Sequence, residues 1–132
     1  MKLQKAFLLI LGFVIVVSLG SIISGGSQKA QVVSAAEGPR VESFTLIDAD
    51  TDREIGQLVN GQVIDASLNV SIRANTNPAT TGSVRFGLDA NTNYRIENTA
   101  PYTLCADKNG ADYYTCDLAT GTHTLTATAY TL

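Results

Sequence analysis

The amino-acid sequence predicts a protein of the all-β class, built as one β-sandwich behind an export signal. Three observations support this prediction. β-Branched and aromatic residues dominate after residue 36, where 15 of the 96 residues are Thr and where Val, Ile and Tyr are frequent. Apolar and polar residues alternate in several short segments, which is the pattern of half-buried strands. Turn-forming Asn, Asp and Gly separate these segments at short, regular spacing.

The clearest alternation occurs in three segments, each with one face directed toward the expected core. These faces consist of Leu68, Val70, Ile72 and Ala74, then Val84, Phe86 and Leu88, then His123, Leu125, Ala127 and Ala129. Shorter strands are expected at 44–47, 62–66, 94–97, 102–106 and 113–117. Seven or eight short strands in about 100 residues predict an immunoglobulin-like Greek-key β-sandwich. The expected core residues are Phe44, Leu46, Leu68, Val70, Ile72, Val84, Phe86, Leu88, Leu104 and Leu125.

The N-terminal segment has the layout of a secretory signal peptide. Lys2 and Lys5 precede an uncharged, mostly apolar run at 6–23, and small residues follow at 24–27. A basic start, an apolar middle and small residues near a cleavage site are typical of such signals. The apolar run is also long enough to span a bilayer, so an uncleaved signal-anchor is the alternative.

The expected cleavage site divides the chain into two parts. Cleavage after Ala35 or Ala36 makes residues 1–36 the signal with its small-residue linker and residues 37–132 the sandwich domain. We expect the domain to fold without the signal, because the strand pattern begins only at Val41.

The charge of the exported part restricts its partners. Residues 37–132 hold 12 acidic and six basic residues, a formal charge of −6. Nucleic-acid binders need a basic surface, so this class is excluded. An acidic domain also disfavours bare phospholipid, so a membrane is a partner only if the N-terminal segment is retained. The expected location is outside the cell or at its surface.

Three motifs occur in a fixed order along the domain. They are VRFGLD at 84–89, NTAPY at 98–102 and GTHTLTATAY at 121–130. Together they resemble the strand, corner and closing strand of the bacterial Ig-like domain family. FTLIDADTD at 44–52 also resembles the first strand of one secreted subgroup of that family. The resemblance covers nearly all of residues 41–130.

The resemblance implies an extracellular accessory module of a bacterium. Such modules are commonly appended to glycoside hydrolases, adhesins and other surface proteins, where they act as spacers, docking surfaces or occasional sugar binders. Other surface proteins or polysaccharide are therefore the implied partners. A shared fold does not by itself determine the function.

Cys105 and Cys116 are the two cysteines of the chain, and an even number in an exported protein predicts a disulfide. A structural zinc site would need four ligands, and His123 is expected on another strand. Two hairpin turns are compatible with the disulfide. A two-residue turn at 110–111 places the cysteines opposite each other, whereas a type I′ turn at 109–110 offsets them by two residues unless a bulge intervenes.

Asp48, Asp50 and Asp52 alternate in the sequence, as acidic ligands do in calcium-binding loops. An EF-hand loop counted from Asp48 would need Gly at its sixth and Glu at its twelfth position, where the chain has Arg53 and Val59. The EF-hand is therefore excluded. A looser calcium site at one end of the sandwich is the alternative. The preferred interpretation is a polar turn without a cofactor, in which Asp side chains accept backbone N–H bonds.

No motif in the sequence predicts catalysis, so we expect the protein not to be an enzyme. His123 is the single histidine, and its place near the start of a strand at the edge of the core favours a structural imidazole over an acid–base catalyst. No G-x-S-x-G nucleophile motif occurs. The clustered carboxylates fall in turns, without the long loops that would build a cleft.

The tyrosines are the candidates for a ligand contact, because carbohydrate sites use exposed aromatic rings. The chain has no Trp and five Tyr. Tyr113 and Tyr114 are neighbours in an expected strand and must point to opposite faces, so one of them is expected to be more exposed. Tyr102 follows Pro101 and resembles a packed corner residue instead.

These observations predict a non-catalytic, exported surface module that mediates binding or assembly at the cell envelope. A carbohydrate-binding module is one alternative. The other is a subunit of an extracellular filament that retains its apolar N-terminus as a buried helix. Lys5, Ala6 and Phe7 fit the start of such a filament signal, but Leu11 stands where an acidic residue is usual.

Overall fold

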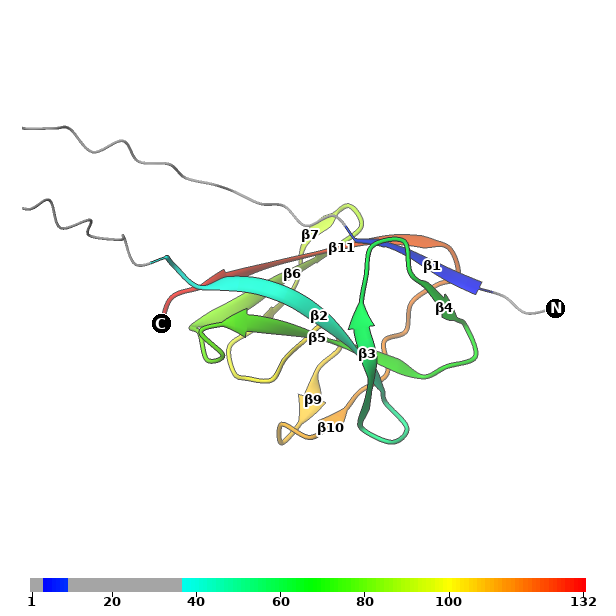
Figure 1. The fold of residues 1–132 in the computed structure, drawn as a ribbon, viewed down its shortest axis with the longest axis horizontal. Helices are drawn as coiled ribbons and strands as arrows, with labels where there is room; N and C mark the ends of the chain where they lie inside the picture. The colour runs from blue at the N-terminus through cyan, green and yellow to red at the C-terminus, as the bar shows by residue number, and fades with distance from the viewer. Residues whose placement is uncertain (1–3, 10–36) are drawn as a thin grey trace, which may run out of the picture.

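The computed structural model describes residues 4–9 and 37–132. These residues form strands and connecting turns, with no helix among them (Figure 1). The strands are β1 (Gln4–Leu9), β2 (Arg40–Asp48), β3 (Arg53–Leu58), β4 (Val63–Asp65), β5 (Val70–Asn77), β6 (Ser83–Leu88), β7 (Asn91–Glu97), β8 (Tyr102–Thr103), β9 (Asp107–Lys108), β10 (Asp112–Tyr113) and β11 (Thr122–Tyr130). The predicted all-β class is confirmed. Within these residues no helix of sufficient length and apolar character to cross a membrane is present.

Two larger sheets and one small ribbon contain these strands. The first sheet has the order β4-β1-β11-β6-β7 and the second has the order β3-β2-β5-β8, while β9 and β10 form a separate two-stranded ribbon. The pairings are antiparallel apart from that of β1 with β11, which is parallel. Buried residues from both larger sheets form one cluster. The core therefore lies between two layers, as in a β-sandwich.

The alternation in the sequence identifies most of this core. Nine of the ten expected core residues are buried, among them Val84 and Phe86 on β6, which are fully enclosed. The expectation for Leu68 is wrong, since 48% of this residue is exposed. β5 begins only at Val70, and the Leu68 N–H donates to the Asp65 carbonyl oxygen at 3.1 Å. This turn interrupts the two-residue period before the strand starts.

β2 and β5 are buried on both faces, which the alternation did not predict. Ile47 and Ser71 face each other across the ladder and are both at 0% exposure, although they point away from the core. The β9–β10 ribbon lies along this outer side of the second sheet (Figure 1). The Tyr113 N–H there donates to the Asp52 carboxylate at 2.7 Å. The ribbon thus adds a third, partial layer over the second sheet.

Tyr102 ties the start of β8 to the segment before β6. Its ring is buried, and its hydroxyl donates to the Thr81 carbonyl oxygen at 2.6 Å while accepting the Thr81 N–H at 2.8 Å. A buried phenol is stable when its hydroxyl has partners for both roles. The packed corner expected at this residue is therefore present.

β3 lies where the sequence analysis expected no strand. It pairs with β2 at the edge of the second sheet, and Leu58 is its one buried residue. An edge strand with so little burial shows no alternation, because nothing selects apolar residues on it. Three other expected strands are shorter than predicted. The segment 62–66 contributes Val63–Asp65, 102–106 contributes Tyr102–Thr103, and 113–117 contributes only its first residue, in Asp112–Tyr113.

β1 lies in the segment interpreted as the export signal. It pairs with both β4 and β11, so the first sheet of the full chain includes six residues that the sequence analysis placed in the signal. The sequence analysis expected the strand pattern to begin only at Val41. The filament interpretation stays a prediction. The expected cleavage sites lie outside the described residues, so cleavage stays a prediction.

Candidate functional site

The β9–β10 hairpin carries several of the residues that the sequence analysis selected. Its register pairs Lys108 with Asp112, which leaves a three-residue turn at 109–111. Neither of the two expected turns occurs. Asn109 and Gly110 adopt positive φ angles of 58° and 77°, and the Asp107 carboxylate accepts the Gly110 N–H at 2.6 Å. Asn and Gly are the residues that adopt this conformation most readily, so the turn follows from local chemistry.

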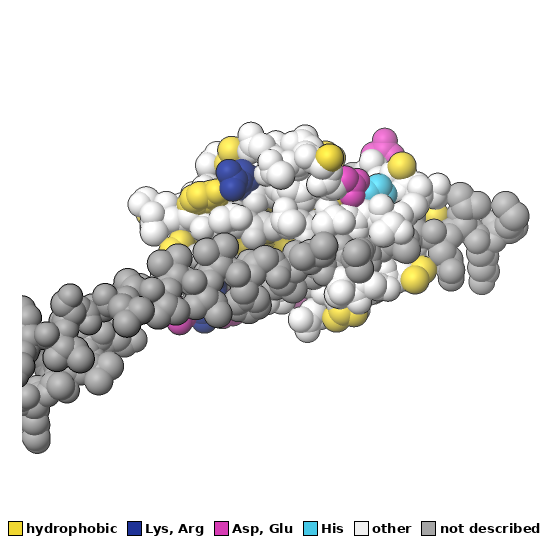
Figure 2. Space-filling view, turned by 90° about the horizontal axis from the view of Figure 1, so that it is seen from above, with side chains coloured by type: hydrophobic (Ala, Val, Ile, Leu, Met, Phe, Trp, Pro, Cys, Tyr) yellow, Lys and Arg dark blue, Asp and Glu magenta, His cyan; other side chains and the backbone are white. Residues whose placement is uncertain are grey.

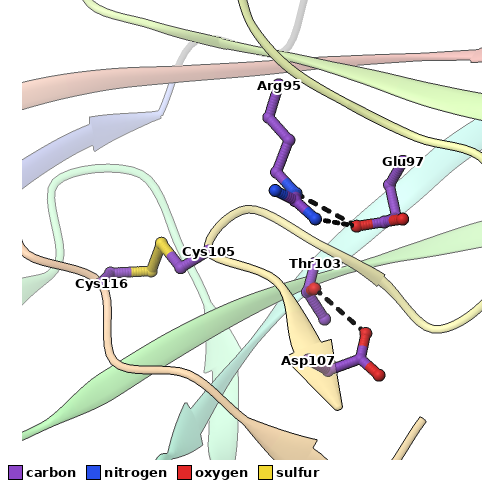
Figure 3. Close-up of a disulfide and its surroundings, with 6 residues drawn as sticks. All are labelled: Arg95, Glu97, Thr103, Cys105, Asp107 and Cys116. Atoms are coloured by element: carbon purple, nitrogen blue, oxygen red, sulfur yellow. Dashed lines mark hydrogen bonds and ion pairs between the residues drawn. A yellow bond between two sulfur atoms is a disulfide. The ribbon is translucent and has the colours of Figure 1, made fainter. Parts of the chain in front are cut away.

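A disulfide closes the base of this hairpin (Figure 3). Cys105 and Cys116 are bonded with their Cα atoms 5.2 Å apart, as the sequence predicts. The Cys116 N–H donates to the Val70 carbonyl oxygen at 2.7 Å. On the other arm, the Leu104 N–H donates to the Ile72 carbonyl oxygen at 2.9 Å. Each arm is thus attached to β5 beside its cysteine. The cross-link raises the free energy of unfolding by roughly 2–3 kcal/mol, because it restricts the unfolded chain.

The three alternating aspartates accept hydrogen bonds from the protein instead of converging on one point. Asp48 accepts the Asp50 N–H at 2.9 Å, and Asp50 accepts the Asn69 side-chain amide at 3.0 Å. Asp52 accepts the Tyr113 N–H. The part of the chain that the structure describes holds no group of three or more His, Cys, Asp or Glu arranged for a metal ion. These contacts are those of a polar turn that also anchors the hairpin, and calcium binding at this turn stays a prediction.

Tyr113 and Tyr114 point to opposite sides of the hairpin. Tyr113 is 9% exposed and Tyr114 is 47% exposed. Arg73 pairs with Glu54 and also interacts with the Tyr113 side chain. Burial lowers the pKa of the Arg73 guanidinium, but the interactions with Tyr113 and Glu54 outweigh it, so the pKa lies above its ordinary value. Tyr113 therefore fastens the hairpin to the sheet, and Tyr114 is the member of the pair left accessible to a ligand.

His123 connects the start of β11 to two other segments. Its Nδ1 lies 2.8 Å from the Asp89 carboxylate and its Nε2 lies 2.7 Å from the Ala119 carbonyl oxygen. The other carboxylate oxygen of Asp89 accepts the Thr124 N–H at 2.8 Å. The bond with His123, followed by that with Thr124, lowers the pKa of Asp89. Figure 2 shows the histidine (cyan) beside an acidic side chain (magenta).

The sequence analysis missed one exposed surface on the outer side of the first sheet, which we call the aromatic face. It consists of Arg85, Tyr94, Ile96, Thr128 and Tyr130. Tyr94, Ile96 and Tyr130 are 44%, 50% and 39% exposed. Arg85 lies between Ile96 on β7 and Thr128 on β11 in the ladder. Its guanidinium carbon lies 5.4 Å from the centre of the Tyr130 ring, within the range of a cation–π contact.

The signal for this face is present in the sequence but incomplete. Arg85 takes an outward position in the predicted alternation of 84–88, and Tyr94 and Ile96 are two residues apart. Their common surface depends on which strands are neighbours in the sheet. A single sequence does not state that order.

No protein-family model, curated protein or solved structure matches the chain. The resemblance of 84–89, 98–102 and 121–130 to the bacterial Ig-like domain family therefore stays a prediction. The fold and the site define an all-β domain with one disulfide-closed hairpin and one exposed aromatic face.

Proposed function

We propose that the chain is a non-catalytic, exported surface module that mediates binding or assembly at the envelope of a bacterial cell. The layout of residues 1–36 supports export. The bond between Cys105 and Cys116 supports the same location, because disulfides persist in oxidising compartments. The proposed location is therefore secreted or displayed on the cell surface.

An immunoglobulin-like Greek-key topology is part of this proposal. From β3 onward the chain crosses between the two sheets at the β3–β4, β4–β5, β5–β6, β7–β8 and β8–β11 connections. Such crossings between sheets, with β6 paired to both β7 and β11, are the connections that Greek-key sandwiches use. They support a likeness to bacterial Ig-like accessory modules.

The aromatic face is the observation that carries the binding function. Tyr and Arg are enriched at protein interfaces, and Tyr offers a large contact area with few freely rotating bonds. The inner side of the same strands is packed with Val84 and Phe86, which are fully buried. The face is therefore held rigid, which lowers the entropy lost on binding. The proposed partner is another surface protein.

A polysaccharide is the second candidate ligand, and the threonines of β11 favour it. Thr126 and Thr128 are exposed on the same outer side as Tyr130. Sugar rings stack on aromatic rings while nearby hydroxyl and guanidinium groups bind their oxygens. In this case Tyr114 on the hairpin would form a separate contact.

A binding measurement on isolated cell envelopes tests the proposal. Exported protein is titrated onto envelopes of the bacterium that produces it, and the double variant Tyr94→Ala with Tyr130→Ala is compared with the unchanged protein. We expect saturable binding that weakens by about tenfold or more in the double variant, as truncation of central aromatic residues does. Ile55→Ala is the matched control, because it removes a comparably exposed apolar side chain from β3 in the other sheet.

Two outcomes would contradict the proposal. One is the absence of saturable binding by the unchanged, folded protein. The other is binding that both variants retain in full. A glycan array separates the two ligand classes, since a polysaccharide ligand gives saturable binding to purified sugars and a protein ligand does not.

A further inference from the structure

β1 occupies a slot between β4 and β11 (Figure 1). It pairs antiparallel with residues 63–65 of β4 and parallel with residues 122–125 of β11. Among the described strands, β1 is the one that connects β4 to β11 and so to the remainder of the first sheet. The slot is therefore one strand wide and is bounded by a backbone edge on each side.

Both edges lose their partner when residues 1–36 are removed. An unpaired strand edge presents N–H and C=O groups that template pairing with another chain. The edge on β11 is also longer than β1 uses. β11 runs over Thr122–Tyr130, whereas β1 pairs with 122–125.

Apolar residues lie on both strands that flank the slot. Ile64 on β4 and Leu125 on β11 are 2% and 1% exposed while the slot is filled. Both belong to the core cluster, together with Leu58 and Leu118. An empty slot would admit water next to this part of the core, which is unfavourable in proportion to the apolar area exposed. The domain therefore favours a strand in this position.

The register indicates which residue types suit the slot. Alternate positions of β1 lie opposite Ile64, His123 and Leu125. Two of these three neighbours are buried and apolar, so apolar residues at alternate positions of the inserted strand are favoured. Lys5 takes the position opposite Ile64, where an aliphatic residue is a better match than a charge. A segment with an aliphatic residue at this position of the register therefore suits the slot.

We propose that the slot between β4 and β11 is a strand-acceptor site, which in the exported protein takes an extended, proline-free segment of a partner protein. This inference rests on the proposed function and adds the place where a partner chain is held. Main-chain hydrogen bonds to both edges supply affinity, and apolar residues at alternate positions supply specificity. A second copy is disfavoured as the partner, because each exported domain carries a charge of −6 and like charges oppose association.

The test uses the exported protein as the cell releases it, with three synthetic peptides. Intact mass first establishes whether residues 4–9 are absent. One peptide has the sequence of residues 1–10, and the second carries Lys5→Leu. The control peptide carries Ala6→Pro and Phe7→Pro, which removes one N–H donor from each side of the strand.

Backbone hydrogen exchange is the readout. We expect the first peptide to slow exchange at 63–65 and 122–125 by about tenfold or more at saturation, because exchange from a paired edge requires local opening. The Lys5→Leu peptide is expected to reach half-saturation at a concentration lower by about threefold or more, since it removes the charge beside a buried residue. The proline peptide is expected to leave exchange at both segments unchanged.

Several outcomes would overturn the proposal. One is hydrogen exchange at 63–65 and 122–125 that is as slow as on β6 before any peptide is added. This result would mean that the slot is already filled, either by retained residues 4–9 or by a second copy in a dimer that light scattering detects. Another is no response to the first two peptides, or an equal response to the proline control. A protein that is exported and binds envelopes through the aromatic face, but fails these tests, disproves the slot alone. A protein that stays inside the cell disproves the proposed function and the slot with it.

Discussion

The two sheets differ in what closes their outer parts. The second sheet is covered by a hairpin that the bond between Cys105 and Cys116 fixes, with a further contact from Asp52 to Tyr113. The first sheet is completed by β1, a strand from residues 4–9 that is held by backbone pairing to β4 and β11. One closure is covalent and internal to residues 37–132. The other depends on a segment that export is expected to remove, and the proposed strand-acceptor site lies at that position.

The largest effect is expected from a residue on which both regions depend. Phe86 on β6 is fully buried between the sheets. Phe86→Ala should lower the free energy of unfolding by about 3–5 kcal/mol, because it removes apolar contacts and leaves a cavity. Chemical denaturation measures this loss, and a single transition in all probes is expected. Two separate transitions would show that the two regions do not share one core.

Removal of the disulfide should affect the hairpin region selectively. Replacement of both cysteines, Cys105→Ser with Cys116→Ser, should lower the free energy of unfolding by roughly 2–3 kcal/mol, because the unfolded chain regains freedom. Hydrogen exchange should accelerate most at the Tyr113 and Cys116 amides. The unchanged protein with a reducing agent is the control. Acceleration that is equal at 122–125 on β11 would contradict the separation of the two regions.

Acid should weaken the contacts at the start of β11. The pKa of Asp89 is lowered from its ordinary value of 3.8 in the folded protein. The carboxylate therefore stabilises the fold fully above that value, and the contribution is lost as the pH falls through the lowered pKa. Asp89→Asn should cost about 1 kcal/mol at neutral pH, a modest amount because the group is half exposed.

Denaturation of the Asp89→Asn variant and the unchanged protein between pH 7 and about pH 2 checks this expectation. Asn is a suitable replacement, because residue 89 has a positive φ of 53° and Asn tolerates that conformation. The two stability curves should converge toward acid pH. Parallel curves across the range would show that the carboxylate does not supply the difference.

The smallest effect is expected at Leu68. Its exposed side chain lies in the turn before β5, so Leu68→Ser should change the free energy of unfolding by no more than about 0.5 kcal/mol. Leu46→Ser is the matched control, because that leucine is buried in the core and its loss should be several times more costly. A large loss at Leu68 in a denaturant titration would mean that the turn packs more tightly than its exposure indicates.

The sequence predicts the strands that face one core, because a single apolar face leaves a two-residue period. This holds for Val84 and Phe86, which are buried where expected. It fails for Ser71, whose burial depends on a hairpin more than 30 residues further along the chain. Local periodicity carries no information about such a covering layer.

The candidate sites were predictable where the chemistry is local. The cysteine pair and the polar turn at 48–52 follow from residue types and spacing. The aromatic face does not, because Tyr94 and Tyr130 belong to strands that are brought together only by their common neighbour β6. The pairing of β1 with β4 and β11 was not predictable either, because backbone hydrogen bonds require no particular side-chain pattern in an apolar segment.

The disulfide also determines what a protease would do to the exported protein. Lys108 is exposed near the tip of the hairpin, inside the loop that Cys105 and Cys116 close, and exposed tips are preferred sites of cleavage. A cut after Lys108 would leave two fragments joined by sulfur. The arm that ends in Leu104 and the arm that begins at Cys116 would each remain bonded to β5. The nicked protein would keep its mass, apart from one added water, and separate into two pieces only under reducing conditions.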